Sequence, residues 1–129
     1  MGKTTFSGKS DINTSVQQMV TFLQDTNNHE QLMPPNIINW KSTSEECSFE
    51  LKNMAKLTMA IQDKMDNGVR IVPKGKAPIS IELEWLVTDT EVTLNLHTEL
   101  NPFIKMMAQK PLQELVDYQC AKLSTLTID

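Results

Sequence analysis

Apolar and polar residues alternate along two stretches in the second half of the chain, residues 79–87 and 92–100. A period of two predicts antiparallel strands that bury one face and expose the other to water. The apolar rows are Ile79, Ile81, Leu83, Trp85 and Val87 in the first stretch, and Val92, Leu94, Leu96 and Leu100 in the second. The two stretches therefore predict neighbouring strands with a shared buried face.

The end of the chain has a different pattern, in which apolar residues recur every three or four positions from Pro102 to about Leu126. This period predicts one long amphipathic helix, with Asn101 as its N-cap and Pro102 in its first turn. Pro111 predicts a kink or break just before it, because proline removes a backbone hydrogen bond. A helix of about 24 residues is roughly 36 Å long, a span that a strand of about ten residues matches.

The preceding part of the chain predicts one strand, two short helices and four further strands. Residues 3–9 form the predicted first strand, and Thr14 with Gln17 fits a capping box that starts a helix ending near Asp25. A second, shorter helical turn is predicted over residues 29–33. The strands that follow are predicted over 37–43, 47–51, 57–65 and from 69, with a hairpin turn at Asn67-Gly68. The expected order is strand, two helices, six strands and a long helix, in one α+β domain spanning residues 1–129.

Composition excludes several classes of function. The net charge is −4, the pI is near 5.1 and the lysines are dispersed, which argues against a general nucleic-acid binder with its basic face. No stretch is long and apolar enough to be an integral membrane segment, and the N-terminus lacks a signal-peptide core. Cys47 and Cys120 fall at apolar positions, so we expect buried, reduced thiols and a cytoplasmic location.

Several short motifs resemble those of one superfamily. They are Met33-Pro34-Pro35 before Asn39-Trp40, then Cys47-Ser48-Phe49, and Asn101-Pro102-Phe103 leading to Lys110-Pro111-Leu112. With the element order, they make the chain similar to small bacterial members of the START and birch-pollen-allergen-like (SRPBCC) superfamily over essentially its whole length. The resemblance implies a helix-grip fold, in which a strongly curved antiparallel sheet of about seven strands wraps around the C-terminal helix. Members carry lipids, sterols, quinones or plant hormones in an apolar cavity, and some are polyketide cyclases.

Candidate catalytic groups are few. His29 and His97 have no metal-ligand spacing to each other or to a cysteine, which favours structural or surface histidines. Glu82, Glu84 and Glu99 alternate against the apolar face, and catalytic carboxylates need a cleft that excludes water, so a solvated outer patch is expected. The sequence therefore predicts no catalytic residue, no metal site and no cofactor.

The predicted inward faces define a candidate cavity for a small hydrophobic molecule. Its predicted lining is Met59, Leu83, Trp85, Leu94, Leu96, Thr98, Phe103, Met107, Leu115 and Gln119. Thr98 and Gln119, together with Tyr118, are polar groups that could orient a ligand, and the alternative for them is a hydrogen bond to nearby backbone. Met106 and Met107 either belong to an ordinary core or line the cavity.

Three functions are compatible with these patterns. The first is binding or transport of a small hydrophobic ligand, such as a lipid, a quinone or a polyketide-like molecule. The second is a polyketide cyclase or hydrolase that uses the same cavity, for which a buried His97 or Glu99 with a shifted pKa would be evidence. The third is a protein-interaction module with an exposed apolar patch, of which a homodimer is one form.

Overall fold

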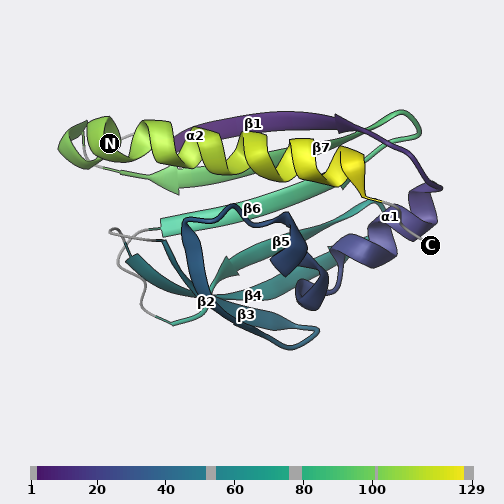
Figure 1. Ribbon diagram of the computed structural model, residues 1–129, viewed down its shortest axis with the longest axis horizontal. Coiled ribbons are helices and arrows are strands. Elements are labelled where there is room, and N and C mark those ends of the chain that lie inside the picture. Colours follow the sequence, from purple (N-terminus) through teal and green to yellow (C-terminus); the bar gives the residue numbers. More distant parts are fainter. Residues whose placement is uncertain (1–2, 52–54, 76–79, 101, 127–129) are drawn as a thin grey trace.

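The computed structural model describes residues 3–51, 55–75, 80–100 and 102–126 (Figure 1). The elements in chain order are β1 (Lys3–Asp11), α1 (Val16–Leu23), the 3-10 helix η1 (Thr26–Leu32), β2 (Ile37–Ser42), β3 (Glu46–Leu51), β4 (Ala55–Met65), β5 (Gly68–Pro73), β6 (Ser80–Val87), β7 (Glu91–Glu99) and α2 (Pro102–Thr125). The predicted order is confirmed. Ile79 and Asn101, which the sequence assigned to a strand and an N-cap, lie outside the described residues.

The seven strands form one antiparallel sheet in the order β1-β7-β6-β5-β4-β3-β2. β1 pairs with β7 along its full length, from Lys3 opposite Glu99 to Asp11 opposite Glu91. Burial alternates strictly along β6 and β7, as the sequence pattern predicted, because one face packs against helices and the other meets solvent. This is the α+β helix-grip architecture that the resemblance implied.

At the other edge of the sheet, β2 is interrupted. Its pairing with β3 shifts register between Ile38 and Lys41, and Asn39 between them has a positive φ of 55°. Asparagine tolerates this left-handed conformation better than other residues with a side chain. The bulge therefore breaks the regular ladder on the exposed edge.

α2 lies along the inner face of the sheet and packs against β1, β7 and η1 (Figure 1). Gly8 of β1 allows the closest approach, since a Cβ at that position would lie 2.9 Å from Val116 Cγ1 and 3.0 Å from Cys120 Sγ. The residues that α2 buries are Ala108, Leu112, Leu115, Val116, Gln119, Cys120 and Leu123. The long helix is therefore clasped by the sheet mainly over its C-terminal two thirds.

Of the kink or break predicted at Pro111, the break is wrong, because α2 is one continuous helix from Pro102 to Thr125. Pro111 cannot donate to the carbonyl of Met107, four residues earlier. Met107 is largely exposed, so water can satisfy that carbonyl and the helix need not end there.

Two local predictions need small corrections. The N-cap of α1 is Ser15, whose Oγ accepts from the backbone N–H of Gln18 at 3.1 Å, while the Gln18 side chain bonds back to the Ser15 N–H. The capping box thus lies one residue later than predicted. The hairpin between β4 and β5 turns at residues 66–67, and Gly68 already pairs with Met65.

Gly68, which the sequence placed in the hairpin turn, has a steric role and not the positive φ that such a turn requires. Positive φ among the described glycines occurs at Gly75 alone. A Cβ on Gly68 would lie 1.9 Å from the carbonyl oxygen of Trp85 on β6. Glycine is therefore required because β5 and β6 approach closely.

The core lies between the inner face of the sheet and the helices. Cys47 and Cys120 are both buried and free, as expected, and burial raises the pKa of the Cys47 thiol to about 12 and that of Cys120 to about 11. None of the described helices is long and apolar enough to cross a membrane.

Candidate functional site

Eight of the ten residues predicted to line a cavity are buried in the interior. They are Met59, Leu83, Trp85, Leu94, Leu96, Thr98, Leu115 and Gln119. Pairing places Leu83 opposite Leu96 and Trp85 opposite Leu94, because the inward rows of β6 and β7 are in register. The interior between sheet and α2 is thus mainly apolar and contains two polar side chains from the predicted set.

Phe103 and Met107 do not belong to this interior. Both side chains are exposed, and so is that of Met106, so neither sequence interpretation of the two methionines holds. The reason is that the first turns of α2 extend past the ends of β1 and β7 (Figure 1), and the buried residues of α2 start at Ala108. Tyr118 is also exposed, on the outer side of the helix.

Four buried side-chain atoms among the described residues have no hydrogen-bond partner, and two of them belong to residues that are fully buried in the interior. One is the indole Nε1 of Trp85, a donor, and the other is the side-chain Oε1 of Gln119, an acceptor. Both residues have no solvent exposure. An unpaired buried donor or acceptor costs about 1–3 kcal/mol, so each atom is a place where a ligand group or a bound water would be stabilised.

η1 closes the interior next to these two residues. The ring of His29 packs against Trp85, and the amide Nε2 of Gln119 lies 3.5 Å from the Sδ of Met33, just after η1. Thr98, the other polar residue of the predicted set, differs from Gln119 because its hydroxyl donates to the backbone carbonyl of Ser80. Thr98 is therefore satisfied by the backbone, whereas the Gln119 carbonyl group is not.

His29 is the interior residue whose position the sequence did not reveal. It is almost fully buried, and its Nε2–H donates to the backbone carbonyl of Leu23 at 2.7 Å. Burial lowers the pKa of His29, although the bond to Leu23 and the charge of Asp25 oppose this effect. The ring is therefore a neutral structural group that joins η1 to the end of α1.

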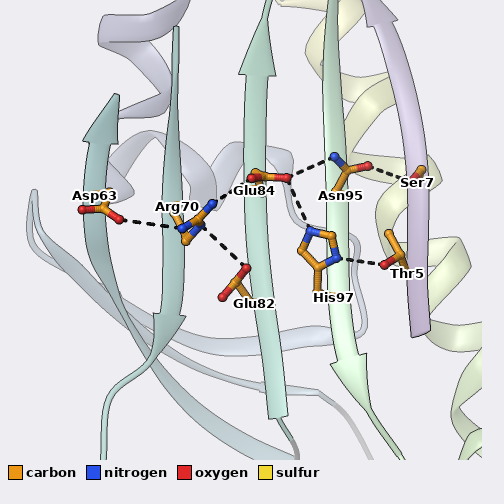
Figure 2. Close-up of polar contacts among 8 residues, drawn as sticks. All are labelled: Thr5, Ser7, Asp63, Arg70, Glu82, Glu84, Asn95 and His97. Atoms are coloured by element: carbon orange, nitrogen blue, oxygen red, sulfur yellow. Dashed lines mark hydrogen bonds and ion pairs between the residues drawn. The ribbon is translucent and has the colours of Figure 1, made fainter. Parts of the chain in front are cut away.

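The opposite, outer face of the sheet carries a polar network across five strands (Figure 2). Arg70 on β5 lies at its centre, with Nη2 3.0 Å from Glu84, Nε 3.7 Å from Glu82 and Nη1 3.8 Å from Asp63. Glu84 in turn lies 3.4 Å from His97 on β7. Of the predicted outer patch, Glu82 and Glu84 thus lie together with His97, in a connected, half-buried network that does not include Glu99.

The network continues to β1. His97 Nε2 faces Glu84 and its Nδ1 lies 2.8 Å from the hydroxyl of Thr5. Asn95 donates to Glu84 at 3.3 Å and accepts from Ser7 at 2.7 Å. The side chains connect neighbouring strands in the same order in which the strands pair, so the network ties β5, β6, β7 and β1 together.

The pKa shifts of Glu84 and Arg70 support a structural role for this network. Burial raises the pKa of Glu84, but hydrogen bonds from Arg70, Asn95 and His97 outweigh it, so the pKa lies below its ordinary value. The hydrogen bond to Glu84 raises the pKa of Arg70. The carboxylate is thus held in its charged form by partners, which is the arrangement of a cross-strand ion pair and not of a proton donor at neutral pH.

Thr5, His97 and Glu84 follow the order of a nucleophile, a base and an acid. They lie on the outer surface of the sheet and not in the interior. A hydroxyl nucleophile also needs donors that stabilise a developing oxyanion. β6 and β7 are paired on both sides, so the backbone N–H groups of these two strands are already used in the sheet and do not provide such donors. Glu99, the other catalytic candidate from the sequence, is exposed at the end of β7. In the sheet register it lies opposite Lys3 of β1 and Ser80 of β6.

An open surface pocket of about 240 Å³ lies at the far end of the sheet. Its lining residues are Lys41, Ser42, Thr43, Glu46, Cys47, Ser48 and Thr58. Most of these side chains are hydroxyls or charged groups, which suits water or a small polar molecule and not an apolar ligand. Among the described residues, no three His, Cys, Asp or Glu side chains gather to hold a metal ion.

No protein-family model matches the chain, and no curated protein matches it. Several solved structures of other proteins are similar to the chain. TTHA0849 from Thermus thermophilus superposes with a TM-score of 0.73 at 14% identity, covering 94% of each chain. A hypothetical protein from Sulfolobus tokodaii gives 0.71 at 15% identity, covering 91% of this chain and 89% of the other.

Ara h 8.0201, a birch-pollen-allergen-like protein, also superposes, with a TM-score of 0.52 at 11% identity over 96% of this chain and 100% of its own. At these identities the likeness shows the fold alone. The chain is therefore an α+β helix-grip protein of the architecture that birch-pollen-allergen-like proteins have.

Proposed function

We propose that this protein binds a small hydrophobic molecule between the sheet and α2, and that Trp85 and Gln119 orient it. The observation that carries the proposal is that two fully buried residues, Trp85 and Gln119, each have an unpaired polar atom in a mainly apolar interior. Ligand pockets commonly combine apolar walls with a few such polar groups. The resemblance to hydrophobic-ligand carriers supports the same reading.

The polar pair also narrows the chemistry of the ligand. Trp85 supplies a donor and Gln119 an acceptor, so a hydroxyl group, which both donates and accepts, would satisfy either atom. The proposed ligand is therefore a lipid, a quinone or a polyketide-like molecule with one hydroxyl or carbonyl group. A plain hydrocarbon would leave both atoms unsatisfied.

The alternative of a cyclase or hydrolase needs an acid–base pair in the same interior. Among the described residues, the buried polar side chains are Ser10, Thr26, His29, Thr98 and Gln119, which include no carboxylate. His29 already uses its Nε2–H on the Leu23 carbonyl. Binding without catalysis is therefore the better supported proposal.

Native mass spectrometry of freshly purified protein tests the proposal directly, because it shows a bound mass and the subunit number together. The second test compares a pyrene-labelled fatty alcohol with pyrene itself as fluorescent probes. Gln119→Leu should weaken binding of the alcohol about three- to tenfold and leave pyrene binding unchanged, since one hydrogen bond is lost.

Gln109→Leu is the matched control, because Gln109 is exposed on the same helix. It should bind both probes as the wild type does. A wild-type protein that carries no bound mass and takes up neither probe would show that the interior is a closed core, and the proposal would then be wrong.

A further inference from the structure

The first turns of α2 present an apolar surface to solvent. Phe103, Met106 and Met107 have exposed fractions of 73, 82 and 69%. With Lys110 they occupy positions i, i+3, i+4 and i+7 of the helix, so all four lie on one side. We call these four residues the outward patch.

The outward patch lies on the opposite side of α2 from the buried row. That row starts at Ala108 and continues through Leu112 and Leu115 toward the sheet. α2 is thus apolar on its inner side near the C-terminus and apolar on its outer side near the N-terminus. Three large apolar side chains clustered in solvent on two helical turns mark an interaction surface.

The charge around the outward patch is positive. Residues 102–113 contain Lys105 and Lys110 and no acidic residue, in a chain whose net charge is −4. Glu114 is the first acidic residue of the helix, one turn after Lys110. On the sheet, Glu99 lies near the start of α2 and is opposite Lys3 on β1.

From this combination we infer that the outward patch docks on an anionic lipid bilayer. A helix that lies in a membrane interface inserts aromatic and aliphatic side chains and places lysines beside the lipid phosphates. Phe103, Met106 and Met107 supply the first part, and Lys110 supplies the second. Lys105 lies on the other side of the helix, two positions from Phe103 and from Met107, and adds to the positive charge of this segment. The inference goes beyond the proposed ligand site and does not require it.

A second copy of this chain is a poorer partner for the same surface. Two-fold pairing of the outward patch would place Lys110 of both copies in the interface and bring two positively charged segments together, and residues 102–113 have no acidic side chain to compensate. An anionic membrane has the complementary charge, and one lysine near such a surface strengthens binding about fivefold.

Vesicle co-sedimentation of the full chain tests this inference. We expect binding to vesicles of equimolar phosphatidylcholine and phosphatidylglycerol, weaker binding at high salt, and little binding to pure phosphatidylcholine. The triple variant Phe103→Gln, Met106→Gln, Met107→Gln should bind at least about tenfold more weakly. The double variant Lys105→Glu, Lys110→Glu should do the same.

Lys122→Glu is the control for charge, because Lys122 is exposed at the other end of α2. It should bind vesicles as the wild type does. All substituted side chains are exposed, so the melting temperature of each variant should stay close to that of the wild type, and glutamine keeps helix propensity high.

A wild-type protein that binds neither kind of vesicle overturns the inference. So does a dimer in light scattering that the triple variant converts to monomer without any vesicle binding. Uptake of the pyrene-labelled alcohol, measured without vesicles, separates the two proposals: vesicle binding without uptake contradicts only the ligand site, and uptake without vesicle binding contradicts only the docking surface.

Discussion

The ring of His29 meets the indole of Trp85 edge to face, with centroids 5.9 Å apart and planes at 76°. This contact joins η1 to β6 inside the protein. Both residues are buried, and aromatic pairs of this geometry contribute about 0.5–1.5 kcal/mol beyond their burial. The contact holds η1 over the interior in which the unpaired indole nitrogen of Trp85 lies.

We predict that this histidine makes the protein less stable in acid. Burial lowers the pKa of His29 below 6.5, so the unfolded chain binds its proton at a higher pH than the folded one. The stability that the neutral ring contributes is therefore present above pH 6.5 and lost as the pH falls below it. The melting temperature of the wild type should drop from neutral pH to pH about 5.

His29→Gln should show a smaller drop over the same interval, because glutamine does not titrate. His97→Asn, which removes the histidine of the outer face, is measured in parallel as the control for a histidine substitution outside the interior. Equal pH dependence in the wild type and in His29→Gln would contradict the assignment of a buried neutral ring.

The outer network makes a prediction about Arg70. Arg70→Met removes the cation that three carboxylates share, and Glu82 and Glu84 would then repel each other. Arg70 is about one third exposed, so the expected loss of unfolding free energy is modest, about 1 kcal/mol. Urea denaturation measures it.

Lys64→Met is the matched control, since its ion pair with Glu45 at 2.8 Å is isolated and exposed. We expect a change within about 0.5 kcal/mol. A double-mutant cycle of Arg70→Met with Glu84→Gln should show coupling between the two residues. Additive effects would mean that the network does not link the strands energetically.

The glycine at the start of β5 should tolerate no side chain. Gly68→Ala places a methyl group 1.9 Å from the Trp85 carbonyl oxygen, so the two strands must separate. We expect a loss of about 3 kcal/mol or the failure to fold, as for other forced overpacking. Gly75→Ala meets no atom within 4 Å and strains only φ, at about 1 kcal/mol.

Both cysteines should resist thiol reagents in the folded protein. Burial raises the pKa of Cys47 to about 12 and of Cys120 to about 11, so the reactive thiolate is scarce at neutral pH. Labelling with a chromogenic disulfide reagent should be slow in buffer and reach both thiols in guanidinium chloride. Rapid labelling of the native protein would contradict the close packing of Cys120 against Gly8.

The sheet and the inward rows could be predicted because alternation sustained over eight or nine residues is typical of a half-buried strand and of little else. Trp85 and Leu94 were placed inside by that period alone. Phe103 and Met107 were misplaced, because a helical period shows which residues share a side and not where the covering sheet ends. The cap of α1 was one residue off because Ser15 and Gln18 repeat the pattern of Thr14 and Gln17.

The half-buried outer network could not be derived from sequence. Alternation correctly assigned Glu84 and His97 to the outer face, but Arg70 becomes their partner only when β5 pairs with β6 in the observed register. His29 has no period around it, since a 3-10 helix of seven residues is too short to show one. Its burial follows from tertiary packing against Trp85.

The pairing of β1 with β7 joins residues 80 to 96 positions apart, and α2 packs against both strands. During synthesis β1 therefore stays without its neighbour until β7 has left the ribosome. Contacts of such long sequence separation make folding slow. Until β7 is available, β1 has an unpaired backbone edge, which is the kind of surface that a chaperone binds.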